Sequence, residues 1–204
     1  MIRFEEFSGG ILDTNAFLLR GLSGNVLIDA PQGADRHFSG EQIDALLLTH
    51  GHFDHVADAA AIQRRHNCRV YYHADTVPMI TDPDFFRNWG FALEVEPVVD
   101  GEIIGETSDF AVCGLHFSVL EVPGHCPGSL CFHLPSEGAL FGGDVLFRGG
   151  LGRWDLPGGD REQLLSGIRK KILPLPAETR VYPGHGPATT VGQERASNPW
   201  LRES

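Results

Sequence analysis

The chain has 204 residues, of which 42% are hydrophobic and 21% charged, so it can bury a full core, and its length favours one domain over residues 1–204. Its formal net charge of −11 argues against a nucleic-acid partner, because proteins that bind the phosphate backbone normally carry a basic surface. No apolar run is long enough to span a bilayer and residues 1–14 contain no secretion signal, so we expect a cytoplasmic protein without a membrane partner.

Apolar runs separated by turn signals predict strands in the first part of the chain. Residues 16–20 and 25–29 flank "GLSG" and predict a β-hairpin. Residues 43–48 predict another strand, and residues 56–66 predict a helix with one apolar face. Residues 76–100 are irregular and aromatic, which leaves two interpretations, a lid over a substrate cleft or a packed connection. The aromatic residues concerned are Phe85, Phe86, Trp89 and Phe91.

The second half of the chain repeats the order of strands followed by a helix. Three consecutive antiparallel strands are predicted at residues 115–122, 129–134 and 139–141. A helix follows in "GGDREQLLSGIRKKIL", where Asp160 and Gln163 have the spacing of a capping box. A last strand, residues 179–182, runs into "PGHGP". This order predicts an α/β sandwich with the sheets inside, although no sequence repeat is visible.

The segment "LLLTHGHFDHVADAA", residues 46–60, places four polar side chains between a buried strand and a helix. They are His50, His52, Asp54 and His55. Such side chains are rarely buried unless a partner satisfies them. Residues two apart in an extended segment point the same way, so His50 and His52 can bind one ion. Asp54 and His55, in the turn into the helix, can reach a second ion.

Three later strand ends each offer one further ligand among glycines, which permit tight turns. They are His125 in "VPGHCPG", Asp144 in "FGGDVLF" and His185 in "VYPGHGP". The complete set of histidines and carboxylates is sufficient for two ions such as Zn²⁺, Mn²⁺ or Fe²⁺, with one carboxylate available to bridge them. A solvated histidine-rich loop is the non-functional alternative, and the ordered recurrence of ligands argues against it.

This pattern, HxHxDH followed by single His, Asp and His residues, resembles the metallo-β-lactamase superfamily. The resemblance implies a four-layer αββα sandwich with a metal pair at one edge of its two sheets. Within the superfamily, "GGDVLFRGGLGRWDLPGGD" and "VYPGHGPATTVGQERASNPWL" are similar to the short, single-domain hydroxyacylglutathione hydrolases, also called glyoxalase II-like proteins. The resemblance covers nearly the whole chain and is weakest between residues 76 and 105.

The resemblance implies two divalent metal ions, with Zn²⁺ as the first choice and Fe²⁺ or Mn²⁺ as alternatives. It assigns His50, His52 and His125 to the first ion, Asp54, His55 and His185 to the second, and Asp144 to both. A hydroxide that bridges the ions would attack the carbonyl of a glutathione-derived thioester, S-D-lactoylglutathione or a related hydroxyacylglutathione. Asp54 is the candidate catalytic residue, because it can orient the hydroxide or accept its proton.

Two arginines, Arg148 and Arg153, follow Asp144 in a glycine-rich loop and are candidate substrate contacts. By the resemblance, Arg153 replaces a lysine that holds a glutathione carboxylate in larger enzymes, and a forked guanidinium suits that group. The alternative is a structural salt bridge from Arg153 to Asp155 or Asp160. Asp155 stands where those enzymes have a glutathione-contacting tyrosine, and we expect the C-terminal helical domain of those enzymes to be missing. The acyl group and the thiol carrier therefore remain open.

Several other residues have two interpretations. Cys126 either tunes the site beside His125 or is a small buried filler, and Asp29 either supports a ligand or caps a turn. The remaining histidines lack ligand spacing and are expected to be structural or exposed: His37, His66, His73, His116 and His133. The cysteines form no CxxC pattern, which fits a reducing cytosol: Cys68, Cys113, Cys126 and Cys131.

The nearest alternative function is a mononuclear-iron persulfide dioxygenase that oxidises glutathione persulfide, with His50, His125 and Asp144 as its implied iron ligands. The "LPGGD" and "NPWL" stretches favour the hydrolase. The missing secretion signal disfavours a β-lactamase, and the acidity and lack of a basic arm disfavour a nuclease. The complete ligand set disfavours a binding protein with an inactive site. The oligomeric state cannot be read from the sequence.

Overall fold

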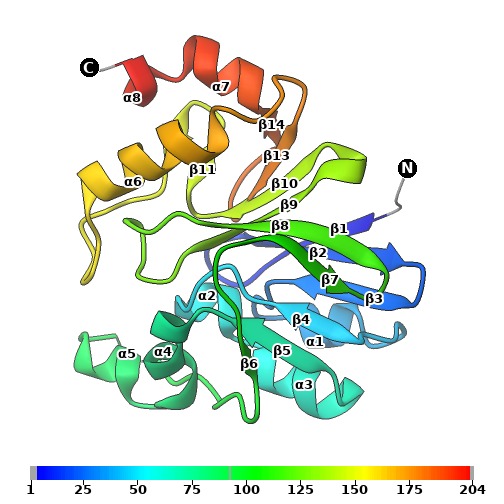
Figure 1. Ribbon diagram of the computed structural model, residues 1–204. Coiled ribbons are helices and arrows are strands. Elements are labelled where there is room, and N and C mark those ends of the chain that lie inside the picture. The colour runs from blue at the N-terminus through cyan, green and yellow to red at the C-terminus, as the bar shows by residue number, and fades with distance from the viewer. Residues whose placement is uncertain (1–3, 92, 203–204) are drawn as a thin grey trace.

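Two six-stranded β-sheets lie face to face at the centre of the computed structural model, which describes residues 4–91 and 93–202 (Figure 1). Helices cover the outer face of each sheet, so the layers run helix, sheet, sheet, helix. The structure therefore confirms the predicted α/β sandwich and its four layers.

The N-terminal half of the chain builds the first sheet. Its strands, in spatial order, are β1 (Phe4–Gly9), β2 (Thr14–Gly21), β3 (Gly24–Ile28), β4 (Ala45–Leu47), β5 (Arg69–Tyr72) and β6 (Glu102–Ile103). The predicted hairpin is confirmed, because β2 and β3 pair in antiparallel fashion. Strands β3 to β6 pair in parallel, and β4 is buried along its whole length because a central parallel strand is covered on both faces.

The C-terminal half builds the second sheet. Its strands, in spatial order, are β14 (Thr189–Thr190), β13 (Arg180–Pro183), β10 (Ala139–Gly143), β9 (Leu130–Leu134), β8 (Leu115–Glu121) and β7 (Thr107–Val112). The three predicted antiparallel strands are β8, β9 and β10. A parallel pair needs a crossover, and the chain passes from β10 to its parallel partner β13 through a small hairpin and a helix. These are β11 (Leu146–Phe147), β12 (Gly150–Leu151) and α6 (Arg161–Gly167).

Three apolar clusters join the layers. The cluster between the sheets is rich in aromatic rings, and Phe141 stacks on Tyr182 with ring centroids 5.3 Å apart. The other two clusters join the first sheet to its covering helices and the second sheet to α6. Because the central strands are mainly apolar on both faces, water is excluded from the layers between and behind the sheets.

The helices on the first sheet are short and follow tertiary contacts more than sequence periodicity. They are α1 (Ala34–His37), α2 (Phe53–Val56), α3 (Ala59–His66), α4 (Val77–Thr81) and α5 (Phe85–Asn88). The prediction of one helix over residues 56–66 is wrong in its first turn, because α2 and α3 are separated at Asp58. The N–H of Asp58 donates to the carbonyl of Ala30, and its carboxylate accepts two N–H groups at the start of α1.

The segment 76–100 is also more regular than predicted, because it contains α4 and α5. The Phe86 side chain is buried in the cluster beneath the first sheet, and Phe85 and Trp89 pack against that cluster. Phe91 remains partly exposed. Most of the aromatic residues therefore pack the connection to the sheet.

The helix α6 begins as predicted, since the carboxylate of Asp160 accepts the N–H of Gln163 at 2.9 Å. It continues through a π-helical turn at Ile168–Ile172, whose two isoleucines are buried. The remaining helices are α7 (Val191–Ser197) and α8 (Pro199–Arg202). In the part of the chain that the structure describes, no helix is both long enough and apolar enough to cross a membrane.

A buried carboxylate, Glu194 of α7, ties the C-terminal helices to the β11–β12 hairpin. It accepts hydrogen bonds from the Thr189 hydroxyl (2.5 Å), the Gly149 N–H (2.8 Å) and the Asn198 amide (2.9 Å). The Asn198 amide also donates to the carbonyl of Gly150 at 3.1 Å. The "NPWL" segment is therefore connected to the loop that follows β10.

Replacement of Glu194 with alanine is expected to lower the free energy of unfolding by about 2–3 kcal/mol, because it leaves buried donors without an acceptor. Urea unfolding followed by circular dichroism measures this loss. The matched control is Glu178→Ala, at an exposed glutamate, which should change stability by no more than about 0.5 kcal/mol. Equal stability of the two variants would contradict the connecting role of Glu194.

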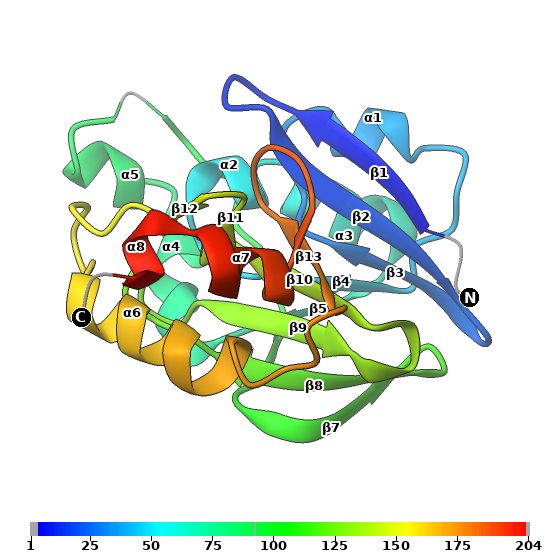
Figure 2. The same ribbon diagram turned by 90° about the horizontal axis from the view of Figure 1, so that it is seen from above.

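Backbone hydrogen bonds join the two sheets along one edge. The N–H of Leu130, at the start of β9, donates to the carbonyl of Thr49, just after β4, at 2.7 Å. The N–H of Asn15, in β2, donates to the carbonyl of Gly184, just after β13, also at 2.7 Å. Figure 2 shows the loop after β13 reaching the N-terminal end of β2. The strand ends that carry the predicted ligands therefore meet at this edge.

Candidate metal centre

The "HGHFDH" segment leaves β4 at this edge and turns into α2. His50 and His52 lie on the stretch before the helix, and Asp54 and His55 lie in its single turn, as the spacing predicts. The side chains of His50, His52 and His55 are buried, so other groups must satisfy them in place of water.

Three imidazole nitrogens converge at one point. The Nε2 atom of His125 lies 3.3 Å from Nε2 of His50 and 2.9 Å from Nδ1 of His52. Ligand nitrogens about 2.0–2.1 Å from a tetrahedral ion lie about 3.4 Å apart, so this spacing suits a first-row metal. Burial lowers the pKa of His125 and lowers the pKa of His52 to about 3. Burial together with the neighbouring imidazoles holds the pKa of His50 far below its usual value. The rings are therefore neutral and offer lone pairs.

A second group lies beside the first, with Asp144 between them. Oδ2 of Asp54 lies 3.4 Å from Nε2 of His55 and 3.2 Å from Nε2 of His185. Oδ1 of Asp144 lies 3.3 Å from Nε2 of His55. Its Oδ2 lies 3.3 Å from Nε2 of His185 and 3.6 Å from Nε2 of His125. The structure thus brings all seven predicted side chains together, with the Asp144 carboxylate within 3.6 Å of nitrogen atoms from both groups.

Opposite charges balance within the second group. Burial acts to lower the pKa of His55, but the surrounding carboxylates outweigh it and raise that pKa well above its usual value. Burial acts in the same way on His185, yet hydrogen bonds to Asp144 and Asp54 raise its pKa to about 10. For Asp54 burial acts to raise the pKa, but the charge of His55 lowers it to about 2. The two carboxylates are ionised and require positive charge beside them.

Some buried atoms of the site lack a hydrogen-bond partner among the described residues. They are Nε2 of His52, Nε2 of His55 and Oδ1 of Asp144. The last two face each other at 3.3 Å without hydrogen-bond geometry, although unpaired buried polar atoms are costly. A cation bound to both atoms removes that cost. Histidine nitrogens combined with carboxylates suit zinc, manganese or iron, so the donor set fits a metal pair.

Asp29 lies behind the ligands and fixes two of them. One of its oxygens lies 2.8 Å from Nδ1 of His55, which leaves Nε2 directed at the centre. The same carboxylate accepts the N–H and the hydroxyl of Thr49, both at 2.8 Å, and that hydroxyl lies 3.1 Å from Nδ1 of His50. Of its two interpretations, the structure favours support of a ligand. Asp29 has a φ of 59°, a conformation that aspartate tolerates better than most residues.

The backbone of Arg153 holds His125, whereas its side chain points to the surface. The Arg153 carbonyl lies 2.7 Å from Nδ1 of His125 and so leaves Nε2 for a metal. Its side chain is 61% exposed, and the guanidinium forms two 2.8 Å hydrogen bonds to Asp155, which is one of the structural alternatives considered for it. Arg148 donates from Nε to the carbonyl of Ala188 at 3.1 Å.

Thr14, at the start of β2, is a site residue that the sequence analysis missed. Its hydroxyl donates to Oδ2 of Asp54 at 2.7 Å, and its backbone pairs with that of His185. The contact fixes the orientation of the Asp54 carboxylate. The one local signal is a pair of polar residues, "TN", at the start of a strand that is otherwise apolar there.

Asn15 and Leu12 hold the loop that carries His185, and sequence reasoning missed them too. The Asn15 amide donates to the carbonyls of Pro183 (3.0 Å) and Gly186 (2.9 Å), which lie 168 and 171 residues further along the chain. The Leu12 carbonyl lies 3.0 Å from Nδ1 of His185. No local pattern can reveal contacts between segments so far apart.

Cys126 packs behind the ligands. Its sulfur lies 3.7 Å from that of Met79, and burial raises its pKa to about 12, so the thiol stays protonated as expected of a buried filler. All four cysteines are free. The histidines expected to be structural or exposed lie outside the ligand groups found in the described chain: His37, His66, His73, His116 and His133.

Comparison with known proteins agrees with this geometry. The sequence pattern of the metallo-beta-lactamase superfamily matches residues 9–185, a range that contains all seven ligands. The chain belongs to this superfamily. Its four-layer arrangement is accordingly the metallo-β-lactamase fold. The cluster of histidines and aspartates lies within the part of the chain that matches this superfamily of metallo-hydrolases.

Relatives of this superfamily member carry several names. Hydroxyacylglutathione hydrolase GloC from Haemophilus influenzae is 37% identical over 161 residues, which cover 78% of this chain and 76% of GloC. The B3 metallo-beta-lactamase BLEG-1 superposes with a TM-score of 0.90 at 35% identity, covering 98% of this chain and 100% of BLEG-1. TTHA1623, in a di-iron-bound form, superposes with a TM-score of 0.86 at 38% identity, covering 97% and 100%.

Asp29→Asn is expected to weaken metal binding by about 10-fold to 100-fold, because asparagine offers one acceptor oxygen where His55 and Thr49 need two. Asparagine tolerates the backbone conformation, so the fold should persist. Competition with a chelator measures the affinity, and Asp109→Asn, at an exposed carboxylate, is the control. Unchanged affinity of the Asp29 variant would show that this contact does not support the centre.

Proposed function

We propose that the protein is a binuclear metallohydrolase that cleaves a thioester, with S-D-lactoylglutathione or a related hydroxyacylglutathione as substrate. The position of Asp144 carries this proposal, since its carboxylate lies within 3.6 Å of ligand atoms from both groups. A carboxylate in this position could serve as a ligand shared by the two metals of a hydrolytic site. The similarity to GloC supports the choice of a hydroxyacylglutathione.

The residues divide the work of the reaction. The two ligand groups would hold two divalent ions, and such ions would lower the pKa of a bound water toward neutrality and polarise a substrate carbonyl. Asp54 is ionised and fixed by Thr14, so it is placed to orient the attacking water and accept a proton. A thiol has a pKa of about 8.5, so the departing sulfur needs less proton donation than an amine does.

We propose that Arg153 and Arg148 contact the carboxylates of the thiol carrier. The pair between Arg153 and Asp155 lies on the surface, where ion pairs stabilise little, so a substrate carboxylate can replace Asp155. The guanidinium then forms the same forked pair with the substrate.

Zn²⁺ is our first choice of metal, because it suits small sets of histidine and carboxylate ligands. Fe²⁺ and Mn²⁺ accept the same donors. TTHA1623 has been solved with two irons, which supports iron as the alternative for this chain.

A second candidate function is the mononuclear-iron persulfide dioxygenase that oxidises glutathione persulfide, because ETHE1 from Myxococcus xanthus superposes on this chain with a TM-score of 0.79 at 25% identity. That reaction would use His50, His125 and Asp144 and leave the Asp54, His55 and His185 group without a metal role. The completeness of the latter group favours the hydrolase. The two reactions also differ in their need for oxygen.

Protein reconstituted separately with Zn²⁺, Mn²⁺ or Fe²⁺ is expected to release thiol rapidly from S-lactoylglutathione without oxygen. Spectrophotometric thiol detection in an anaerobic chamber measures this rate, and the metal-free protein is the control. Nitrocefin is tested in parallel because of the similarity to BLEG-1. No thiol release from any form, together with oxygen consumption on glutathione persulfide by the iron form, would replace the hydrolase with the dioxygenase.

Asp144→Ala is expected to abolish both metal retention and turnover, because it removes the ligand shared by the two groups. Elemental analysis of the purified variant counts the metals, and the thioester assay measures the rate. The control is Asp155→Ala, which should retain both metals because the Asp155 side chain is exposed. A variant at position 144 that keeps two metals and the full rate would refute the assignment.

A further inference from the structure

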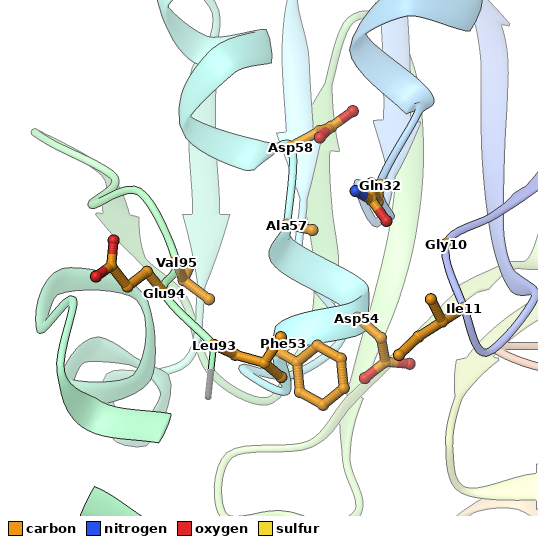
Figure 3. Close-up of a pocket in the computed structure, with 10 residues that line it drawn as sticks. All are labelled: Gly10, Ile11, Gln32, Phe53, Asp54, Ala57, Asp58, Leu93, Glu94 and Val95. Atoms are coloured by element: carbon orange, nitrogen blue, oxygen red, sulfur yellow. The ribbon is translucent and has the colours of Figure 1, made fainter. Parts of the chain in front are cut away.

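A pocket of about 250 Å³ opens beside the metal centre (Figure 3). Its walls come from Gly10 and Ile11 of the β1–β2 turn, from Phe53 and nearby residues of the α2 segment, and from residues 93–95. Asp54 belongs both to the pocket and to the second ligand group. A molecule in the pocket is therefore next to the reactive end of the site.

Most of the pocket wall is apolar, although Gln32 and acidic residues also line it. The carboxylate of Asp58 accepts two backbone N–H groups from the start of α1, at 2.8 Å and 3.0 Å. The carboxylate of Glu94 forms an ion pair with Arg87. Figure 3 shows both carboxylates directed away from the space between Ile11 and Phe53. A group bound there meets mainly aliphatic and aromatic carbon, with the Asp54 carboxylate at its metal-centre end.

The β1–β2 turn exposes two adjacent aliphatic side chains next to this pocket. Ile11 is 80% exposed and Leu12 is 49% exposed, and Ile11 extends toward Asp54 in Figure 3. One exposed aliphatic residue is ordinary, but an exposed Ile11 in the pocket wall with an exposed aliphatic neighbour favours an apolar ligand. The Leu12 carbonyl also contacts the ring of His185, so the turn is held in place relative to the ligands.

We propose that this pocket binds the acyl group of the substrate and selects thioesters whose acyl chain is apolar and longer than lactoyl. The proposal rests on the thioester hydrolysis proposed above and adds the class of acyl group. A thioester carbonyl at the metal centre has its acyl group on one side and its thiol carrier on the other. The mainly apolar wall of the pocket suits the acyl group.

The charges favour the same orientation. Among the described residues that line the pocket there is no lysine or arginine, so a carrier with carboxylates finds no partner inside it. The arginines proposed for the carrier, Arg148 and Arg153, lie instead around the β11–β12 hairpin. Arg36 lines an adjoining open hollow, which shares Gly10 and Ile11 with the pocket. The opposite orientation, with a carboxylate of the thiol carrier bound near Arg36, is therefore the alternative that the experiment must distinguish.

The test compares acetyl, lactoyl, butanoyl and hexanoyl thioesters of glutathione. Each methylene that becomes buried should raise kcat/KM about threefold to fourfold, so wild-type protein should prefer hexanoyl to acetyl by at least about 20-fold. Ile11→Ser removes an apolar wall, and Ala57→Leu fills the pocket. Each variant should lose at least about fivefold more of its kcat/KM on the hexanoyl substrate than on the acetyl substrate.

The matched control is Leu22→Ser, an exposed aliphatic residue at the opposite end of β2, which should leave the whole series unchanged. A second series varies the thiol at constant acyl group. If kcat/KM depends on the length of the thiol rather than of the acyl chain, and Arg36→Ala reduces that dependence, the thiol carrier occupies this side of the site. That result overturns the proposed orientation of the substrate. Equal rates across the acyl series overturn the proposal while the hydrolase stands.

A binding measurement separates failure of the pocket from failure of the proposed function. 1-Hexanol, which carries no charge, should shift the methyl resonance of Ile11 in protein labelled with ¹³C at isoleucine methyl groups, whereas ethanol at equal concentration should not. Ile11→Ser identifies the resonance. A shift without cleavage of any thioester supports the apolar pocket and overturns the hydrolase. Absence of a shift with hexanol overturns the pocket.

Discussion

Two largely buried carboxylates, Asp54 and Asp144, stand among five imidazoles where the edges of two apolar sheets meet, and the surroundings of the site are arranged around their charge. Burial of an ionised group costs several kcal/mol unless opposite charge lies beside it. The histidines nearest the carboxylates carry raised pKa values, while those of the other group are kept neutral by burial. The group of Asp54, His55 and His185 can therefore accept cations, and the group of His50, His52 and His125 offers neutral nitrogen ligands.

The sandwich delivers these groups without long side chains. Strands β4, β10 and β13 are apolar along their buried lengths, and the polar residues of the site follow their C-terminal ends. The edge is closed by backbone hydrogen bonds between the sheets, so four separate loops are held at fixed positions. A second set of contacts then fixes the rings of His55, His125 and His185, through the Asp29 carboxylate and the carbonyls of Arg153 and Leu12 respectively. The metal ligands are preorganised because every layer behind them is packed.

The two sides of the centre differ in chemistry, which gives the proposed substrate a direction. Exposed arginines lie around the β11–β12 hairpin, and exposed aliphatic residues lie on the β1–β2 turn. An acidic protein with a net charge of −11 can still receive an anionic substrate if its charged end approaches the arginines and its apolar end enters the pocket beside Asp54. Local arrangement, rather than total charge, decides which molecules reach the site.

The ligands and most strands were predictable from the sequence because their signals are local. The spacing of His50, His52, Asp54 and His55, and the apolar runs before each glycine-rich strand end, are determined by neighbouring residues and by the period of a strand. Only the tertiary structure decided that α2 and α3 break at Asp58, that Thr14 and Asn15 serve the site, and that Arg153 holds His125 through its backbone. Those features depend on hydrogen bonds between segments that are distant in the chain. These bonds outweigh the local conformational preferences, and they produce no periodic pattern in the sequence.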